Sequence, residues 1–329
     1  MLELTELSIS RDKALFQPLL DAGGLRLPAR LTCLYGAFGD GILVGCCGRL
    51  DNVIQCAAVS PETRGEGVLS ALVSQLVTDI RMEGYGEAFV FTRPGSVPRF
   101  LPLGFSLLAS TADAAFLCTR SDAVARWVRR VPPPAPESIL PGRPYAHGCI
   151  VMNANPFTLG HQFLVRQAAE KCGFLTVLVV EADVSRFPFA HRLNMVRAGV
   201  AAFSNVQAVP AGPFAISLAT FPTYFLKEPS HGAAVHGALD AALFAEQVAP
   251  ALGVDARFVG SEPLDPMTEG YRAALAAALP PGGIALETVE RFTLHGEPVS
   301  ASRVRALLDA GQTDAAKALT PESTWPYLT

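Results

Sequence analysis

Prolines crowd into one stretch of this chain, VPPPAPESILPGRP at Val131–Pro144. Proline fixes φ and has no amide hydrogen to donate, so this stretch cannot be a central strand or the interior of a helix. The chain has 329 residues, and single cores stop growing at roughly 250–300 residues. We therefore predict two domains, 1–131 and 147–329, joined by an extended linker over 132–146.

The composition limits the classes of function. Half of the residues are hydrophobic and 17% are charged, which excludes a disordered chain. The net charge of −4 disfavours binding to nucleic acid or a membrane through a general positive field. Acidic residues near the N-terminus and the lack of a long apolar span predict a cytoplasmic protein. The seven cysteines include no CxxC pair, so we expect buried free thiols and no metal site.

The pattern before the linker is rich in strands. Val68–Met82 has apolar residues at helical spacing and predicts a helix. Short apolar and β-branched runs, bounded by turn residues, predict strands. These strands are expected at Thr32–Phe38, Ile42–Gly48, Val53–Val59, Ala88–Thr92, Phe105–Ala109 and Ala114–Cys118. The first domain is therefore predicted to be α/β with an antiparallel component.

Strands and helices alternate after the linker. Strands are predicted at His147–Met152, Thr176–Glu181, Val206–Val209 and Arg257–Val259, and helices at Leu159–Lys171, Phe189–Ala202, Ala238–Ala249 and Ser302–Ala310. Such alternation indicates a doubly wound, Rossmann-like parallel sheet with helices on both faces. Ligands of these sheets bind beyond the carboxyl ends of the strands.

The first of these strands leads into NANPFTLGH, residues 153–161, just before a predicted helix. Pro156 suits a turn, and Gly160 allows the backbone to approach a ligand closely. The free amides and positive dipole end of the helix favour an anion, which Thr158 and His161 would face. This motif by itself is explained equally well by an ordinary turn with a histidine cap.

A second motif, VSASRVR at residues 299–305, opens the last predicted helix. Ser300 or Ser302 is a good N-cap. The two hydroxyls and the planar guanidinium of Arg305 suit a triphosphate. A capped surface helix with solvated arginines is the alternative. Both motifs occur in one βα domain, which favours the phosphate site.

T-x-G-H with a late S-x-S-x-x-R resembles the nucleotidyltransferase superfamily. Within it, five segments in matching order resemble the citrate lyase ligase family: NANPFTLGH, SRFPFAHR, SLATFPTYFLK, RFVGSEP and VSASRVR. This resemblance implies an AMP-forming acid–thiol ligase. Such an enzyme uses ATP and acetate to acetylate the phosphopantetheine-type prosthetic group of the citrate lyase acyl-carrier subunit, through an acetyl-adenylate. Mg²⁺ is expected as the phosphate counter-ion.

Residue roles follow from this resemblance. Acetate is already ionised at neutral pH, so the enzyme must supply positioning and charge stabilisation rather than a general base. The expected catalytic residues are His161, Thr158, Arg305 and Lys227. The expected nucleotide contacts are Asn153, Asn155, Pro156, Phe157, Gly160, Arg192, Gly260, Glu262, Ser300 and Ser302. For Arg192, Lys227, Gly260 and Glu262, a plain surface or turn role explains the sequence equally well.

The first domain resembles the GNAT acyltransferase fold over about residues 33–118. AAVSPETRGEGV, residues 57–68, is similar to the loop whose amides hold the pyrophosphate of coenzyme A in that fold. The contacts expected here are Arg64, Gly65 and Gly67. Leu69 replaces a small residue of that loop, which argues against independent acetyltransferase activity. We expect this domain instead to bind the prosthetic group, which is derived from coenzyme A.

Two other functions remain as alternatives. One is an adenylyltransferase acting on a small phosphate or carboxylate, which would form no acetyl hydroxamate. The other is a GNAT-type acetyltransferase that depends on acetyl-coenzyme A, which would release no AMP.

Overall fold

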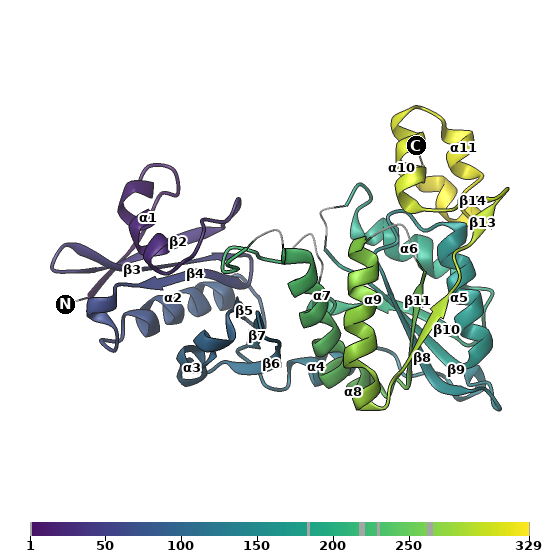
Figure 1. The fold of residues 1–329 in the computed structure, drawn as a ribbon, viewed down its shortest axis with the longest axis horizontal. Coiled ribbons are helices and arrows are strands. Elements are labelled where there is room, and N and C mark those ends of the chain that lie inside the picture. Colours follow the sequence, from purple (N-terminus) through teal and green to yellow (C-terminus); the bar gives the residue numbers. More distant parts are fainter. Residues whose placement is uncertain (1, 183–184, 217–220, 229–230, 262–265, 329) are drawn as a thin grey trace. The chain divides into compact units, whose positions relative to one another are not determined.

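A computed structural model describes the chain except for residues 1, 183–184, 217–220, 229–230, 262–265 and 329, and for the side chains of 266–268 (Figure 1). It divides into two compact units. Unit 1 comprises Met1–Ala123 and Pro222–Leu239, and unit 2 comprises Val124–Phe221 and Asp240–Thr329. Residues 222–239 thus belong to the N-terminal unit, whereas the sequence predicted two continuous domains. The boundaries of independently folding domains stay a prediction.

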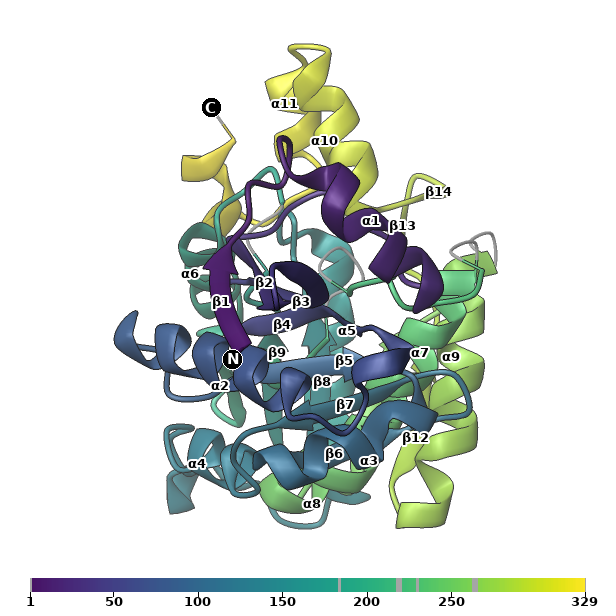
Figure 2. The same ribbon diagram turned by 90° about the vertical axis from the view of Figure 1, so that its left-hand side faces the viewer.

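Unit 1 is built on a seven-stranded sheet in the order β1-β2-β3-β4-β5-β7-β6. Only β4 and β5 are parallel among its neighbouring strands. Its helices α1 (Lys13–Ala22) and α2 (Val68–Met82) lie on opposite faces of the sheet (Figure 1, Figure 2). The strands are β1 (Leu2–Glu6), β2 (Cys33–Gly39), β3 (Ile42–Leu50), β4 (Val53–Val59), β5 (Phe89–Thr92), β6 (Ser106–Ser110) and β7 (Ala115–Cys118). The predicted α/β architecture with antiparallel pairing is confirmed, although the sequence missed β1 and α1.

The parallel strands β4 and β5 pair only at their beginnings, where Val53 and Ile54 lie opposite Phe89 and Val90. Residues 222–226 lie beside β5 beyond this point. The hydroxyl of Tyr224 donates to the carbonyl of Phe91 at 2.9 Å. Arg26 donates to the carbonyls of Thr223 at 2.7 Å and Leu226 at 3.1 Å. A segment from the C-terminal half of the chain therefore completes unit 1.

Unit 2 contains a five-stranded sheet in the order β10-β9-β8-β11-β12, and all its pairs are parallel. Helices α5 (Leu159–Lys171) and α6 (Phe189–Val200) lie on one face, and α9 (Pro266–Ala278) lies on the other (Figure 1). The strands are β8 (Tyr145–Met152), β9 (Cys172–Val179), β10 (Val206–Pro210), β11 (Ala256–Gly260) and β12 (Ala285–Val289). The doubly wound parallel sheet predicted from the alternating pattern is confirmed.

The winding of this sheet reverses between β8 and β11. The two strands pair only where Gly148 and Cys149 lie opposite Ala256 and Arg257. Their carboxyl ends therefore form the kind of crevice in which open α/β sheets bind ligands.

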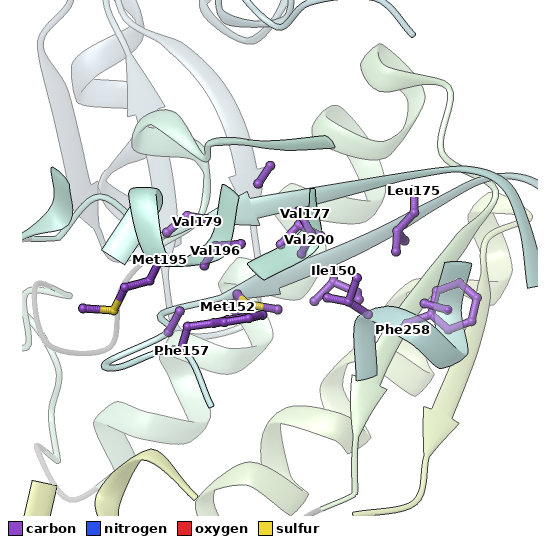
Figure 3. Packing of buried hydrophobic residues seen from close by; sticks show 14 of the residues in the cluster. Ile150, Met152, Phe157, Leu175, Val177, Val179, Met195, Val196, Val200 and Phe258 are labelled. Atoms are coloured by element: carbon purple, nitrogen blue, oxygen red, sulfur yellow. The ribbon is translucent and has the colours of Figure 1, made fainter. Parts of the chain in front are cut away.

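Apolar side chains between this sheet and α5 and α6 form the core of unit 2 (Figure 3). All eight residues of β9 are buried, as expected for a parallel strand covered on both faces. Phe157 is fully buried at the start of α5, and a Cβ added at Gly199 of α6 would lie 2.4 Å from its ring. Close packing of the two helices thus fixes the chain that follows β8.

The remaining helices differ partly from the sequence prediction. The predicted helix Ala238–Ala249 begins earlier, as α7 (Gly232–Leu243), and continues through a π-helical turn at Phe244–Val248 into α8 (Ala249–Leu252). Short elements include α3 (Val97–Phe100), α4 (Ala123–Val128), α10 (Ala301–Asp309), α11 (Thr313–Lys317) and the hairpin β13 (Thr293–Leu294) and β14 (Glu297–Pro298). All seven cysteines are buried free thiols, as predicted. None of the described helices is long and apolar enough to cross a membrane.

Candidate active site

A cavity of about 450 Å³ opens at the carboxyl ends of β8 and β11 in unit 2. Both sequence motifs contribute to its wall, although about 140 residues separate them in the chain. The predicted site residues that line it are Asn153, Asn155, Thr158, Gly160, His161, Gly260, Ser300, Ser302 and Arg305. The fold therefore brings most of the predicted nucleotide site to one place.

Thr158 and His161 form a reciprocal cap at the start of α5. The Thr158 hydroxyl accepts from the amide of His161 at 3.3 Å, and the amide of Thr158 donates to His161 Nδ1 at 3.0 Å. The local sequence thus satisfies two amides that the first helical turn would leave without partners. The same bonds lock the imidazole, so the histidine both caps the helix and faces the cavity.

This cap also determines which nitrogen of His161 carries the proton. Because Nδ1 accepts from the Thr158 amide, the neutral ring carries its hydrogen on Nε2. Burial, and secondarily the nearby charge of Arg291, lowers the pKa of His161 to about 4. At neutral pH the ring is therefore an uncharged donor. Among the described residues, Nε2 has no hydrogen-bond partner that would compete with a ligand.

The second motif is tied directly to the first. Arg305 Nη1 donates to the carbonyl of Asn155 at 2.6 Å. Ser300 caps α10 by accepting from the amide of Arg303 at 3.1 Å, and its hydroxyl lies 3.0 Å from that of Ser302. A Cβ at Gly160 would lie only 3.0 Å from the carbonyl oxygen of Val299. Glycine therefore lets the starts of α5 and α10 approach closely, and both positive dipole ends border one cavity.

Several predicted nucleotide contacts lie elsewhere. Arg192 is fully buried beneath the cavity loop. Its guanidinium donates to the carbonyls of Asn153 at 2.8 Å, Val180 at 2.7 Å and Phe187 at 3.0 Å. Backbone carbonyls thus accept the Arg192 hydrogen bonds that were expected to go to a phosphate. Arg192 therefore stabilises the loop that contains Asn153.

Three other predicted residues lie outside this wall: Pro156, Phe157 and Lys227. Phe157 is buried, and its ring stacks on His161 with 5.7 Å between centroids. Pro156 precedes it in the same loop and is not part of the cavity wall. Lys227 is exposed and belongs to unit 1. Glu262 lies outside the described residues.

Arg257, Tyr271 and Arg291 are among the cavity-lining residues that were not predicted from the sequence. Arg291 follows β12, a strand that was not predicted, and its amide donates to the hydroxyl of Ser261 at 3.1 Å. Its cation adds to the positive potential around His161. The preceding segment, ALETVE at residues 285–290, contains two glutamates and a threonine, so no apolar run marked a strand before Arg291. Among the described residues, no group of three metal-ligating side chains occurs.

Unit 1 has a cavity of its own, about 590 Å³ in volume. Arg64, Gly65 and Gly67 line it, as does Leu69. Gly65 and Gly67 have φ of +93° and +80°, a backbone region that disfavours side chains. Gly67 is the N-cap of α2 and offers no side chain to its amides. Backbone donors and three cations, Arg64, Arg93 and Arg99, thus border this cavity.

Comparison with known proteins identifies the family of the chain. Residues 147–328 match the family model described as the citrate lyase ligase C-terminal domain. The chain belongs to the citrate lyase ligase family. A citrate (pro-3S)-lyase ligase of Klebsiella pneumoniae is 40% identical over 291 residues, covering 87% of this chain and 83% of the relative. One from Escherichia coli strain K12 is 36% identical over 296 residues, covering 88% and 82%. Members of the citrate lyase ligase family are enzymes, and the chain is a ligase.

Solved structures also show similarity to part of the chain. An acyl-CoA N-acyltransferase of Klebsiella pneumoniae is 17% identical with a TM-score of 0.31, covering 36% of this chain and 96% of that structure. A GNAT-family acetyltransferase of Desulfovibrio desulfuricans is 17% identical with a TM-score of 0.30, covering 36% and 98%.

Proposed function

We propose that this ligase uses ATP to convert acetate to acetyl-adenylate in the unit 2 cavity, and then acetylates a carrier thiol. The carrier is the acyl-carrier subunit of citrate lyase, whose phosphopantetheine-type prosthetic group supplies the thiol. AMP and diphosphate are the other products. The observation that carries this proposal is the meeting of two helix N-termini with the neutral Nε2–H of His161 in one cavity.

The phosphates are expected to lie across the starts of α5 and α10. Free amides and aligned dipoles stabilise anions there. Arg305 and Arg291 line the same cavity and add two positive charges. Ser300 and Ser302 supply short hydroxyl donors. Mg²⁺ would arrive on the nucleotide as the counter-ion of its phosphates.

The first step forms a bond between a carboxylate oxygen of acetate and the α-phosphorus. The bond from the α-phosphorus to the bridging oxygen breaks, and diphosphate leaves with the electron pair. Acetate is ionised at neutral pH, so no base is needed. His161 stays neutral and donates Nε2–H to the developing charge, because its pKa near 4 excludes an imidazolium at neutral pH. Positioning and electrostatics therefore account for the step.

In the second step the carrier thiolate attacks the acetyl carbonyl, and AMP leaves. The thiol proton passes to solvent. We propose that the unit 1 cavity binds the coenzyme A-derived arm of the carrier, with its phosphate at Arg64 and the amides that follow Gly65 and Gly67. Two observations support this: the loop glycines leave open space beside the backbone, and the start of α2 has no side-chain cap.

The test uses the purified full chain with ATP, Mg²⁺, acetate and hydroxylamine. Acetate-dependent AMP, diphosphate and acetyl hydroxamate are expected, since hydroxylamine traps the acetyl-adenylate. Diphosphate without hydroxamate would indicate an adenylyltransferase instead. Acetyl transfer from acetyl-coenzyme A without AMP release would indicate a GNAT-type acetyltransferase.

A further inference from the structure

The guanidinium of Arg257 in unit 2 is buried, and two of its nitrogens lack a hydrogen-bond partner among the described residues. Arg257 of β11 is 1% exposed. Its Nη2 lies 3.4 Å from the hydroxyl of Tyr271, and its Cζ lies 4.3 Å from the centroid of the Phe244 ring. Within the described part of the chain, Nε and Nη1 are buried and find no hydrogen-bond partner. Unpaired buried donors on a charged group are costly, so this arrangement calls for an explanation.

The neighbouring acid does not pair with this arginine directly. Asp240 accepts from the Tyr271 hydroxyl at 2.6 Å and from the amide of Ile216 at 2.8 Å. Tyr271 thereby commits its hydrogen to Asp240 and turns its oxygen toward Arg257. The chain Asp240–Tyr271–Arg257 therefore orients the guanidinium while leaving donors free.

The position of this arginine connects it with the proposed chemistry. Arg257 and Tyr271 line the same cavity as His161 and Arg305. Arg257 stands on the strand at which the winding of the sheet reverses, whereas His161 and Arg305 belong to the two capped helices. The cavity thus has a cation on its strand side in addition to the donors expected to hold the phosphates.

We propose that Arg257 binds the carboxylate of the acid substrate, and that Tyr271 positions the guanidinium for this. The inference rests on the proposed function and names the residue that selects a small carboxylic acid. A guanidinium matches a planar carboxylate through parallel N–H bonds. Phe244 covers one face of the guanidinium and does not occupy its N–H edges. One carboxylate oxygen stays on Arg257 while the other forms the bond to the α-phosphorus, and Arg257 keeps its proton throughout.

The irregular helix beside this site supports the assignment. Phe244 begins the π-helical turn Phe244–Val248, and such turns are uncommon and concentrate at functional sites. The turn places the aromatic ring over Arg257 rather than a polar group that would satisfy Nε and Nη1. The fold thus leaves Nε and Nη1 of Arg257 without a partner among the described residues.

The experiment measures the acetate-dependent exchange of diphosphate into ATP with the full chain. For Arg257→Met we expect the KM for acetate to rise about tenfold or more, because a charge-assisted contact is lost, while the KM for ATP changes less than about twofold. Tyr271→Phe should raise the KM for acetate a few-fold, since only the orientation is lost. Arg272→Met is the matched control, because Arg272 is the next residue of α9 and pairs with Glu269 on the surface.

A binding measurement separates this inference from the proposed function. Line broadening of ¹³C-labelled acetate in NMR spectra reports binding without any turnover. The wild-type chain should broaden the signal, and Arg257→Lys, which keeps the positive charge but loses the planar guanidinium, should broaden it less. Equal broadening, or equal rises of the two KM values in Arg257→Met, would overturn the assignment. A wild-type chain that binds acetate through Arg257 but exchanges no diphosphate would instead contradict the proposed reaction.

Discussion

Both units contain a cavity beside the N-terminus of a helix, but the groups that line the two cavities differ. In unit 2, side chains fixed by caps line the cavity, as with Thr158 and His161 on α5. In unit 1, the amides after Gly65 and Gly67 line it, and α2 begins without a side-chain cap. Locked side chains suit a step that needs charge placed accurately on a reacting phosphate. Backbone amides on an open loop suit the holding of an anion that does not react.

This comparison predicts that substitutions in unit 2 affect the chemical step and those in unit 1 affect only the acceptor. The largest effect is expected for His161→Ala. Loss of a preorganised donor should lower the kcat for acetyl hydroxamate formation about 10²–10³-fold. His295→Asn, in an exposed turn, is the matched control and should retain wild-type rates. A His161→Ala rate within about threefold of wild type would remove His161 from the mechanism.

Arg305→Met should have the next largest effect. The substitution removes a cation from the phosphate side of the cavity and the 2.6 Å bond to the Asn155 carbonyl. We expect the KM for ATP to rise about tenfold, measured in the same hydroxamate assay. Arg303→Met is the control, because Arg303 faces Glu297 and does not line the cavity. Equal rises of the KM for ATP in the two variants would show that ATP binding depends on the total positive charge near α10 rather than on the contact made by Arg305.

Arg64→Met tests the other side of the comparison. An exposed contact to a phosphate should contribute modestly, so the KM for the carrier subunit should rise about threefold to tenfold. Hydroxamate formation, which needs no carrier, should not change. Arg81→Met removes a cation from the far end of α2 and serves as the control. If Arg64→Met lowers hydroxamate formation instead, unit 1 takes part in adenylation and the division of roles is wrong.

The last prediction concerns acid stability rather than activity. The folded-state pKa of His161 is about 4, below its ordinary value of about 6.5. The unfolded chain therefore binds a proton more readily, and stability that is complete above about pH 6.5 is lost as the pH falls toward about 4. His161→Asn lacks this titration. The unfolding free energy of the wild type relative to that of His161→Asn should fall by roughly 3 kcal/mol between pH 7 and pH 4. Arg64→Met should show no such change.

Elements with strong local signals were predicted well from the sequence. The bounds of α2 and α5 agree with the predictions, because apolar spacing defines both helices and a threonine cap marks the start of α5. Strands β1 and β12 were missed. Their sequences, LELTE and ALETV, contain no continuous apolar run, and most of their side chains are not buried.

Contacts between distant parts of the chain could not be predicted in this way. Arg192 was expected at a phosphate, but carbonyls from three separate segments surround it. Arg257 contacts Tyr271 on α9, which follows it in the chain, and Phe244 in the π-helical turn that precedes it. The placement of residues 222–226 in unit 1 depends on Arg26, almost 200 residues earlier. Local patterns carry no information on such pairings.

The most direct test of the account is the mass of the carrier itself. The full chain is incubated with deacetylated citrate lyase acyl-carrier subunit, ATP, Mg²⁺ and acetate, and intact carrier mass and AMP are measured together. We predict the addition of one acetyl group to each carrier with one AMP released, and no addition when the prosthetic-group thiol has been alkylated. Acetylation that proceeds without ATP, or AMP release that leaves the mass of an active carrier unchanged, would contradict the account.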